Sequence, residues 1–238
     1  MTREEIVESY SNNGTEFILP IEALTQKLKG IKALIFDWDG VFHSGYKNEN
    51  QSSLFSEADS MGVNMLRFAY ALINEGEIPY TAIITGENNK TAFYWAEREH
   101  LNDVFFKIKD KVEILNWLVE NKGLKKEEVL FVFDDILDLS MAKECGVRYL
   151  INRKASIALH SYCKSNKICD LITANDGGNH AVRELSELTI SLLGNWDTVV
   201  SERVKFNDKY APYIQKRQEI KTYFYTLNNG VVTLDKRK

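Results

Sequence analysis

The stretch Ile31-Lys32-Ala33-Leu34-Ile35-Phe36-Asp37-Trp38-Asp39-Gly40 decides the fold class of this 238-residue chain. Its apolar part is short and almost uninterrupted, as in a strand buried on both faces of a sheet, and it ends in two acids. Similar short apolar runs recur along the chain. They lie at 81–84, 104–106, 129–133, 147–151 and 171–173.

Longer segments with helical spacing of apolar residues alternate with these runs. They cover 61–74, 88–100, 111–121, 137–145 and 179–193. Repeated strand–helix alternation predicts an α/β fold, in which right-handed crossovers place helices on both faces of a parallel sheet. We therefore predict one such core over residues 31–193.

Three segments do not follow the alternation. Residues 1–30 are predicted to be an N-terminal extension with a short helix around Glu22 to Lys29. Residues 44–59, with a polar turn at 48–51, are predicted to form a small β-hairpin insertion. Residues 194–238 form an aromatic and basic extension, in which the spacing of Phe206, Tyr210 and Tyr213 gives an aromatic stripe if the segment is helical. We expect this stripe to contact another copy of the chain, the alternative being that it packs on its own core.

Bulk properties limit the partners and the location. The net charge of −4 gives no basic surplus of the kind that nucleic-acid binding usually requires. Residues 1–10 carry charges where a signal peptide needs an apolar core, and no apolar run approaches the roughly 20 residues that span a bilayer. The cysteines, three in number, are too few for a disulfide framework. We expect a cytoplasmic protein that binds neither nucleic acid nor membrane.

The polar residues that matter for function follow the strands, because open parallel sheets bind ligands beyond the carboxyl ends of their strands. Asp37 and Asp39 follow the first strand. A carboxylate such as Asp37 can attack phosphorus, and a second acid such as Asp39 can protonate the leaving oxygen. Alone, Asp-x-Asp-Gly is as compatible with a simple turn.

Other strand ends supply groups that suit a phosphate. Thr85 and Gly86 precede a helix and could bind phosphate through a hydroxyl and backbone N–H groups, although Thr85 is equally suited to cap that helix. Lys111 could neutralise Asp37 and the incoming phosphate, unless it is an ordinary surface lysine.

Acids after the 129–133 strand suit a metal ion. Mg²⁺ prefers hard oxygen ligands, and one or two carboxylates with a substrate phosphate suffice. Asp134 is the candidate ligand, together with Asp37 and the carbonyl of Asp39. Asp135 and Asp138 would support the site, Asp138 by orienting a metal-bound water or Lys111. The alternative is a solvated acidic cap on the following helix.

Taken in order, these motifs resemble those of the haloacid dehalogenase-like phosphatases. They are Asp37-Trp38-Asp39-Gly40, Ile83-Ile84-Thr85-Gly86, Lys111-x-x-x-Leu115 and Asp134-Asp135-x-x-Asp138. A narrower resemblance, to the subfamily of 3-deoxy-octulosonate 8-phosphate phosphatases, rests on Gly40-Val41-Phe42, Asp59-Ser60-Met61-Gly62-Val63 and the segment 177–184. It covers about 31–193.

The resemblance implies a Rossmann-like core, no large cap domain and a Mg²⁺ cofactor. Subfamily members are typically homotetramers in which hairpins associate and neighbouring chains help to close each active site. The short gap between Asp39 and Thr85 also leaves no room for a folded cap. Without a cap, subunit assembly is one way to exclude water, so we expect a homo-oligomer, with a tetramer favoured by the resemblance.

Several positions depart from the subfamily pattern. Ala58 and Glu87 stand where arginines are frequent, and an arginine there could grip a substrate carboxylate that glutamate would repel. Ser44, His180 and Phe133 also differ. The residues that remain as candidates for substrate contact are Gly86, His43, Lys47, Lys90 and Arg183. Arg183 is equally compatible with a structural role beside Gly177-Gly178.

The leading hypothesis is Mg²⁺-dependent hydrolysis of a small phosphate monoester, derived from a sugar or sugar acid, through an aspartyl phosphate. Two alternatives stay open. One is a phosphotransferase that uses the same intermediate, and the other is a non-catalytic assembly or regulatory protein on a phosphatase scaffold.

Overall fold

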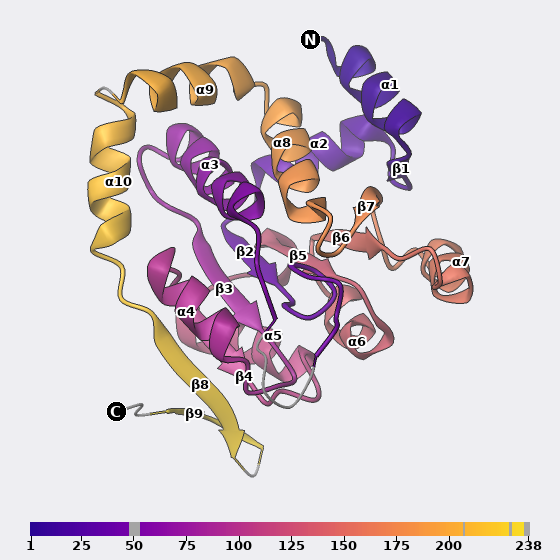
Figure 1. The fold of residues 1–238 in the computed structure, drawn as a ribbon, viewed down its shortest axis with the longest axis vertical. Coiled ribbons are helices and arrows are strands. Elements are labelled where there is room, and N and C mark those ends of the chain that lie inside the picture. Colours follow the sequence, from indigo (N-terminus) through magenta and orange to yellow (C-terminus); the bar gives the residue numbers. More distant parts are fainter. Residues whose placement is uncertain (48–52, 207, 229, 236–238) are drawn as a thin grey trace.

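A single nine-stranded sheet organises the computed structural model, which describes residues 1–47, 53–206, 208–228 and 230–235 (Figure 1). The strand order is β1-β7-β6-β5-β2-β3-β4-β8-β9. The strands are β1 (Glu16–Phe17), β2 (Ala33–Phe36), β3 (Tyr80–Ile84), β4 (Asp103–Phe106), β5 (Val129–Phe133), β6 (Val147–Asn152), β7 (Leu171–Asp176), β8 (Tyr223–Asn228) and β9 (Val231–Leu234).

The strands from β7 to β8 are mutually parallel, and only the outermost two, β1 and β9, run antiparallel to their neighbours. The chain passes from β2 outward to β3 and β4 on one side, and then crosses to β5, β6 and β7 on the other. Between β2 and β5 the winding direction therefore reverses, and a crevice opens beyond the carboxyl ends of such strands.

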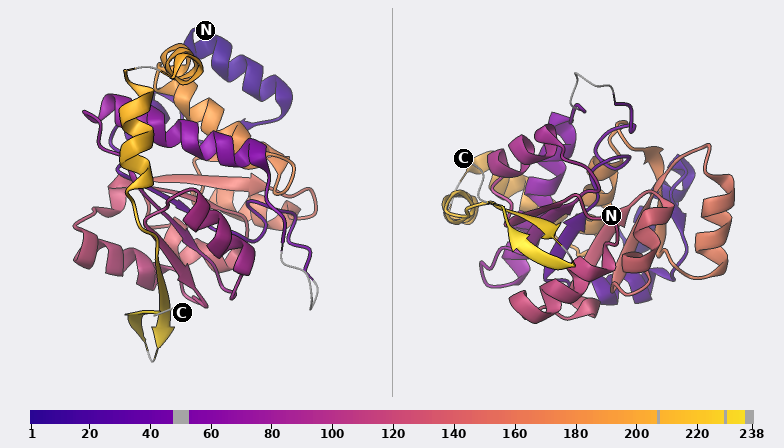
Figure 2. Two further views of the ribbon diagram at one scale, coloured as in Figure 1. Left: turned by 60° about the vertical axis from the view of Figure 1, so that its left-hand side comes forward. Right: turned by 90° about the horizontal axis from the view of Figure 1, so that it is seen from below.

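Helices cover both faces of the sheet (Figures 1 and 2). They are α1 (Arg3–Asn13), α2 (Ile21–Lys29), α3 (Glu57–Ile73), α4 (Lys90–Arg98), α5 (Val112–Lys122), α6 (Leu139–Ala142), α7 (Ile157–Ser165), α8 (Ala181–Leu192), α9 (Trp196–Lys205) and α10 (Tyr210–Gln218), with single 3₁₀ turns at Lys126–Glu128 and Ile136–Asp138.

Alternation along β2 divides the core in two. Leu34 and Phe36 pack in one apolar cluster with α1 to α4 and α8 to α10, whereas Ala33 and Ile35 pack in a second cluster with α5, α6 and α7. Both clusters are buried, which explains why this strand is apolar at every position. The prediction of an α/β fold with a parallel sheet between helices is confirmed.

The six strands expected from the apolar runs are present, and the structure adds three that the sequence did not suggest. β1 joins the sheet at β7, and β8 joins it at β4, so both terminal segments extend the same sheet. Helices α1 and α7 were not expected either. The hairpin β8–β9 reaches beyond the other strands (Figure 2).

The predicted hairpin at 44–59 is only partly described. Residues 44–47 and 53–56 form no strand, and α3 begins at Glu57. The predicted turn at 48–51 lies outside the described residues.

The aromatic stripe of the C-terminal segment packs on its own chain, so the expectation that Tyr210 and Tyr213 contact another copy is wrong. Both rings lie 5.0 Å from the ring of Phe68 on α3 and are buried. The hydroxyl of Tyr213 also donates to the backbone carbonyl of Asn64 at 2.9 Å. Phe206, in contrast, is half exposed.

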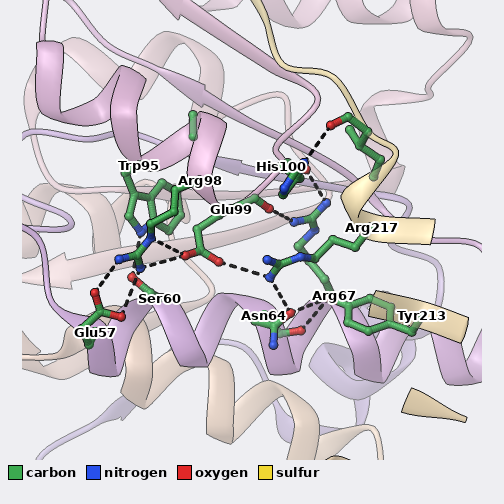
Figure 3. A network of polar contacts seen from close by, with 12 residues as sticks. Glu57, Ser60, Asn64, Arg67, Trp95, Arg98, Glu99, His100, Tyr213 and Arg217 are labelled. Carbon is green, nitrogen blue, oxygen red and sulfur yellow. Dashed lines mark hydrogen bonds and ion pairs between the residues drawn. The ribbon is translucent and has the colours of Figure 1, made fainter. Parts of the chain in front are cut away.

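A buried polar network attaches α10 to the core beside these rings (Figure 3). Arg217 donates to Oδ1 of Asn64 at 2.9 Å and to Oε2 of Glu99 at 3.2 Å. Arg67 is fully buried and donates to the backbone carbonyls of Glu99 and His100. The network therefore links α10, α3 and the end of α4.

Among the described residues, no helix is long and apolar enough to cross a membrane.

Candidate active site

The carboxyl ends of β2, β3 and β5 surround one cavity of about 310 Å³ at the crevice. Residues that the sequence analysis singled out after each of these strands line it, and Lys111 at the start of α5 closes one side. The lining residues on which the site is built are Asp37, Asp39, Gly86, Lys111, Asp134, Asp135 and Asp138.

Lys111 lies between two acids at the side of the cavity. Its Nζ is 2.6 Å from Oδ1 of Asp37, and it also pairs with Oδ1 of Asp138. Burial disfavours the ammonium, but the two carboxylates outweigh it and raise the pKa of Lys111. Asp138 therefore contacts Lys111, and Lys111 is buried and is not an ordinary surface lysine.

Three buried carboxylates gather at the same point. Oxygens of Asp37, Asp134 and Asp138 all lie within 4.8 Å of one another. Burial, and then the neighbouring charges of Asp37 and Asp138, raises the pKa of Asp134 to about 9. Burial also raises the pKa of Asp37 to about 7, against the opposing effect of Lys111.

This cluster fits a hard divalent cation. Ionised carboxylates so close together in a buried site repel one another, and a cation among them removes that cost. Asp138 is held in place because its Oδ2 accepts the backbone N–H groups of Asp134 and Asp135 at 3.4 and 3.2 Å. Asp134 is also paired with the guanidinium of Arg153.

Asp39 is surrounded by hydrogen-bond donors. Its Oδ1 receives Nε2 of His43 at 2.9 Å and Nδ2 of Asn89 at 3.3 Å. Its Oδ2 receives Nζ of Lys47 at 2.7 Å and the hydroxyl of Thr85 at 3.4 Å. Burial raises the pKa of Asp39, but the hydrogen bonds from His43 and Lys47 outweigh burial, and the net effect lowers it.

Glycine is required at position 40 because the backbone there lies close to the carboxylate of Asp134. Its φ of +85° lies in the left-handed region, and a Cβ at this position would stand 2.0 Å from Oδ2 of Asp134. Gly177 packs against the other side of the same loop, where a Cβ would stand 1.9 Å from the carbonyl oxygen of Gly40. The Gly177-Gly178 segment thus supports the loop that carries Asp39.

Thr85 does not cap the helix that follows it. Asn89 is the N-cap residue of α4 and accepts the N–H of Thr91 at 3.2 Å. The hydroxyl of Thr85 instead accepts the N–H of Glu87 at 3.2 Å and reaches Asp39. The alternative of Thr85 as a helix cap is therefore wrong.

Two candidate substrate residues are not brought to this cavity. Lys90 lies exposed in the first turn of α4, and Arg183 lies on α8, where it pairs with Glu187. His43 reaches Asp39 and lies 6% exposed. Phe133 is fully buried and stacks on Phe131, so it does not narrow the acid cluster.

Arg153 and Asn89 belong to the site but were not singled out from the sequence, whereas Glu87 was noted there as a departure from the subfamily pattern. Arg153 and Glu87 line the cavity, and Asn89 bonds to Asp39. Arg153 follows the carboxyl end of β6, so the strand-end rule applied to 147–151 would have found it. Asn89 is visible in the sequence only as a potential helix cap.

Comparisons with known proteins find phosphatases among those similar to this chain. The chain is 25% identical over 190 residues to 3-deoxy-D-manno-octulosonate 8-phosphate phosphatase KdsC of Escherichia coli strain K12, an alignment that covers 78% of this chain and 93% of that protein. No family model matches the chain.

Solved structures similar to this chain are likewise described as phosphatases. A probable YrbI family phosphatase from Pseudomonas syringae pv. phaseolica is 29% identical, with a TM-score of 0.63 over 79% of this chain and 99% of that one. The 3-deoxy-D-manno-octulosonate 8-phosphate phosphatase of Moraxella catarrhalis, solved with magnesium, phosphate and KDO, is 25% identical, with a TM-score of 0.63 over 79% of this chain and 100% of that one.

Proposed function

We propose that this chain, a phosphatase of the haloacid dehalogenase-like superfamily, hydrolyses a small phosphorylated sugar or sugar acid with the help of Mg²⁺, through a phosphorylated Asp37. The observation that carries the proposal is the convergence of Asp37, Asp39, Lys111 and Asp134 on one cavity, from the ends of β2 and β5 and from the start of α5. A turn or a solvated acidic cap would not bury Asp37, Lys111 and Asp134 together.

Asp37 is proposed as the nucleophile. Its carboxylate attacks phosphorus, the bond from phosphorus to the leaving oxygen breaks, and water later cleaves the resulting aspartyl phosphate. Lys111 supports this role because its ammonium, 2.6 Å from Oδ1 of Asp37, offsets the repulsion between the carboxylate and an anionic phosphate. Asp138 holds Lys111 in that position.

Asp39 is proposed as the acid and base. It gives a proton to the leaving oxygen in the first step and takes one from the attacking water in the second. Thr85 and Gly86 are proposed to hold phosphate oxygens, since Gly86 lines the cavity and Thr85 lies beside Asp39.

Mg²⁺ would be held by the carboxylates of Asp37 and Asp134 and by the backbone carbonyl of Asp39, with Asp138 in support. When bound, the ion would neutralise negative charge on the phosphate and the acids. The magnesium in the Moraxella catarrhalis relative supports this choice of metal.

The relatives' names support a sugar-derived substrate, and the cavity suits a small ester. Glu87 lines the cavity where the family pattern favours an arginine, so a substrate carboxylate at that point would meet a like charge. We propose that the accepted esters differ there from 3-deoxy-octulosonate 8-phosphate. A cytoplasmic homo-oligomer, with a tetramer favoured, remains part of the proposal.

Phosphate release from a panel of sugar and sugar-acid phosphates tests the proposal, measured with Mg²⁺ and with EDTA. We expect turnover that requires the metal and is lost in Asp37→Asn. Full activity in Asp37→Asn would exclude the aspartyl phosphate. No turnover of any ester by a protein that binds Mg²⁺ would instead favour the non-catalytic scaffold.

A further inference from the structure

His43 lies buried beside the proposed active site, and both of its ring nitrogens are engaged. Nδ1 accepts the backbone N–H of Gly45 at 3.1 Å, and Nε2 lies 2.9 Å from Oδ1 of Asp39. The ring also lies 6.1 Å from the indole of Trp38. These contacts leave the imidazole little freedom to turn.

The two contacts also fix the tautomer. A backbone N–H can only donate, so Nδ1 must present its lone pair to Gly45. The hydrogen of the neutral ring is then on Nε2, where it donates to the carboxylate of Asp39.

The donors around Asp39 differ between its two oxygens. Oδ1 is held by His43 and Asn89, both of which are buried. Oδ2 is held by Thr85 and by Lys47, whose side chain is 37% exposed and lines the catalytic cavity. Oδ2 is therefore the oxygen on the cavity side, and Lys47 is the donor that a substrate can displace.

We propose that His43 is a positioning residue for the transfer of the proton from Asp39 to the leaving oxygen, an inference that rests on the proposed function. Once the substrate has displaced Lys47 and Asp39 carries a proton on Oδ2, Asp37 forms its bond to phosphorus and the bond between phosphorus and the leaving oxygen breaks. The electrons of the broken bond remain on the leaving oxygen, which takes the proton from Oδ2. His43 keeps its own hydrogen throughout. Its hydrogen bond to Oδ1 strengthens as negative charge develops on Asp39, and it also keeps Oδ2 facing the cavity.

This role predicts that the effect of losing His43 depends on how basic the leaving oxygen is. A weakly basic leaving oxygen, as in p-nitrophenyl phosphate, needs little help from a proton, whereas the strongly basic oxygen of an alkyl ester such as glycerol phosphate needs it fully. Loss of His43 must then slow the alkyl ester more than the aryl ester.

The experiment compares kcat/KM for these two esters in wild type, His43→Leu and His43→Gln. General acid catalysis is worth about 10²- to 10⁴-fold, and we expect His43→Leu to lower the ratio of alkyl to aryl rates by about tenfold or more. His43→Gln retains a side-chain N–H and should restore part of the ratio. Both rates come from one preparation, so the ratio does not depend on how much of a variant folds.

Two controls separate this inference from the proposed function. Ser44→Ala, at the exposed neighbour of His43, should keep the wild-type ratio. In an Asp39→Asn background, His43→Leu should have no further effect on it. If the wild-type protein turns over both esters and His43→Leu has the same ratio of alkyl to aryl rates, the inference about His43 alone is overturned. Full activity of Asp37→Asn would instead overturn the proposed mechanism.

Discussion

Nζ of Lys111 at the start of α5 lies 2.6 Å from Oδ1 of Asp37 at the end of β2, and both side chains are buried. The pair joins two elements that are far apart in the sequence, and it places a cation in contact with the proposed nucleophile. Asp138 shares the same ammonium. Replacing Lys111 with a neutral residue would leave the buried acids Asp37 and Asp138 without the cation that they share, so the lysine is needed for stability as well as for the proposed chemistry.

The acid cluster should make the metal-free protein less stable as the pH rises. The folded state holds protons on Asp37 and Asp134, with pKa values of about 7 and about 9, that the unfolded chain releases near its ordinary value of 3.8. At pH values between 3.8 and these folded-state pKa values, the folded state binds more protons than the unfolded state. The free energy of unfolding therefore falls with increasing pH. Urea unfolding in EDTA at about pH 5 and about pH 8 measures the slope.

Asp134→Asn is the control for that slope. Removal of one titrating acid should make the free energy of unfolding fall less steeply with pH. In wild type, Mg²⁺ should restore stability at the higher pH, because the ion binds only the folded state. An equal slope in wild type and Asp134→Asn would show that other groups cause the pH dependence.

Asp134→Asn should also weaken Mg²⁺ binding. Loss of even an outer partner of a metal site costs about 10- to 100-fold in affinity, and Asp134 lies within the cluster itself. Asp135→Asn is the matched control, because Asp135 lines the same cavity but lies outside that cluster, where its exposed side chain accepts the N–H of Ile136. Titration calorimetry with Mg²⁺ alone measures both, and equal affinities would contradict the assignment.

Gly40→Ala should disturb the metal site, whereas Gly76→Ala should not. Both glycines have positive φ, at +85° and +87°, so alanine costs about 1 kcal/mol of backbone strain at either position. Only at Gly40 does the new methyl group meet Asp134, since nothing lies within 4 Å of a Cβ at Gly76. Mg²⁺ affinity and the unfolding midpoint of the two variants distinguish strain from displacement of the acid.

Tyr213→Ala should lower the free energy of unfolding by about 3 to 5 kcal/mol, because the ring is buried against Phe68 on α3. Tyr213→Phe should lose only about 1 kcal/mol, from the hydrogen bond to the carbonyl of Asn64. Tyr223→Ala, at a position 47% exposed, is the control. Urea unfolding checks all three, and a Tyr213→Ala protein as stable as wild type would mean that α10 does not hold the core.

The sequence was informative where one local pattern determined the outcome. The strand β2 is apolar at each of its positions because both of its faces are buried, and Asp37 follows it directly, so strand and acid could be predicted together. The same pattern predicted Asp134 after β5. Parallel strands bring such residues to one edge, which is why the acid cluster could be predicted without any knowledge of side-chain contacts.

The terminal segments were harder to predict because their structure depends on distant partners. β1 has two residues, and nothing local marks it as a strand until it pairs with β7. Tyr210 and Tyr213 have helical spacing, but only tertiary packing decides whether their rings face Phe68 or another copy. The contact of His43 with Asp39 likewise depends on a loop turn that the sequence pattern does not specify.

The pairing of β8 with β4 also bears on how the chain emerges from the ribosome. Residue for residue, Asp103 pairs with Tyr223 and Phe105 with Tyr225, although the whole of β5, β6, β7 and their helices is synthesised in between. During synthesis the edge of β4 therefore remains unpaired long after its own residues have appeared, and an unpaired edge is where nascent chains associate with one another. A chain whose synthesis ends before residue 223 would keep this edge of β4 unpaired. We therefore expect such fragments to depend on chaperones more than the finished protein does.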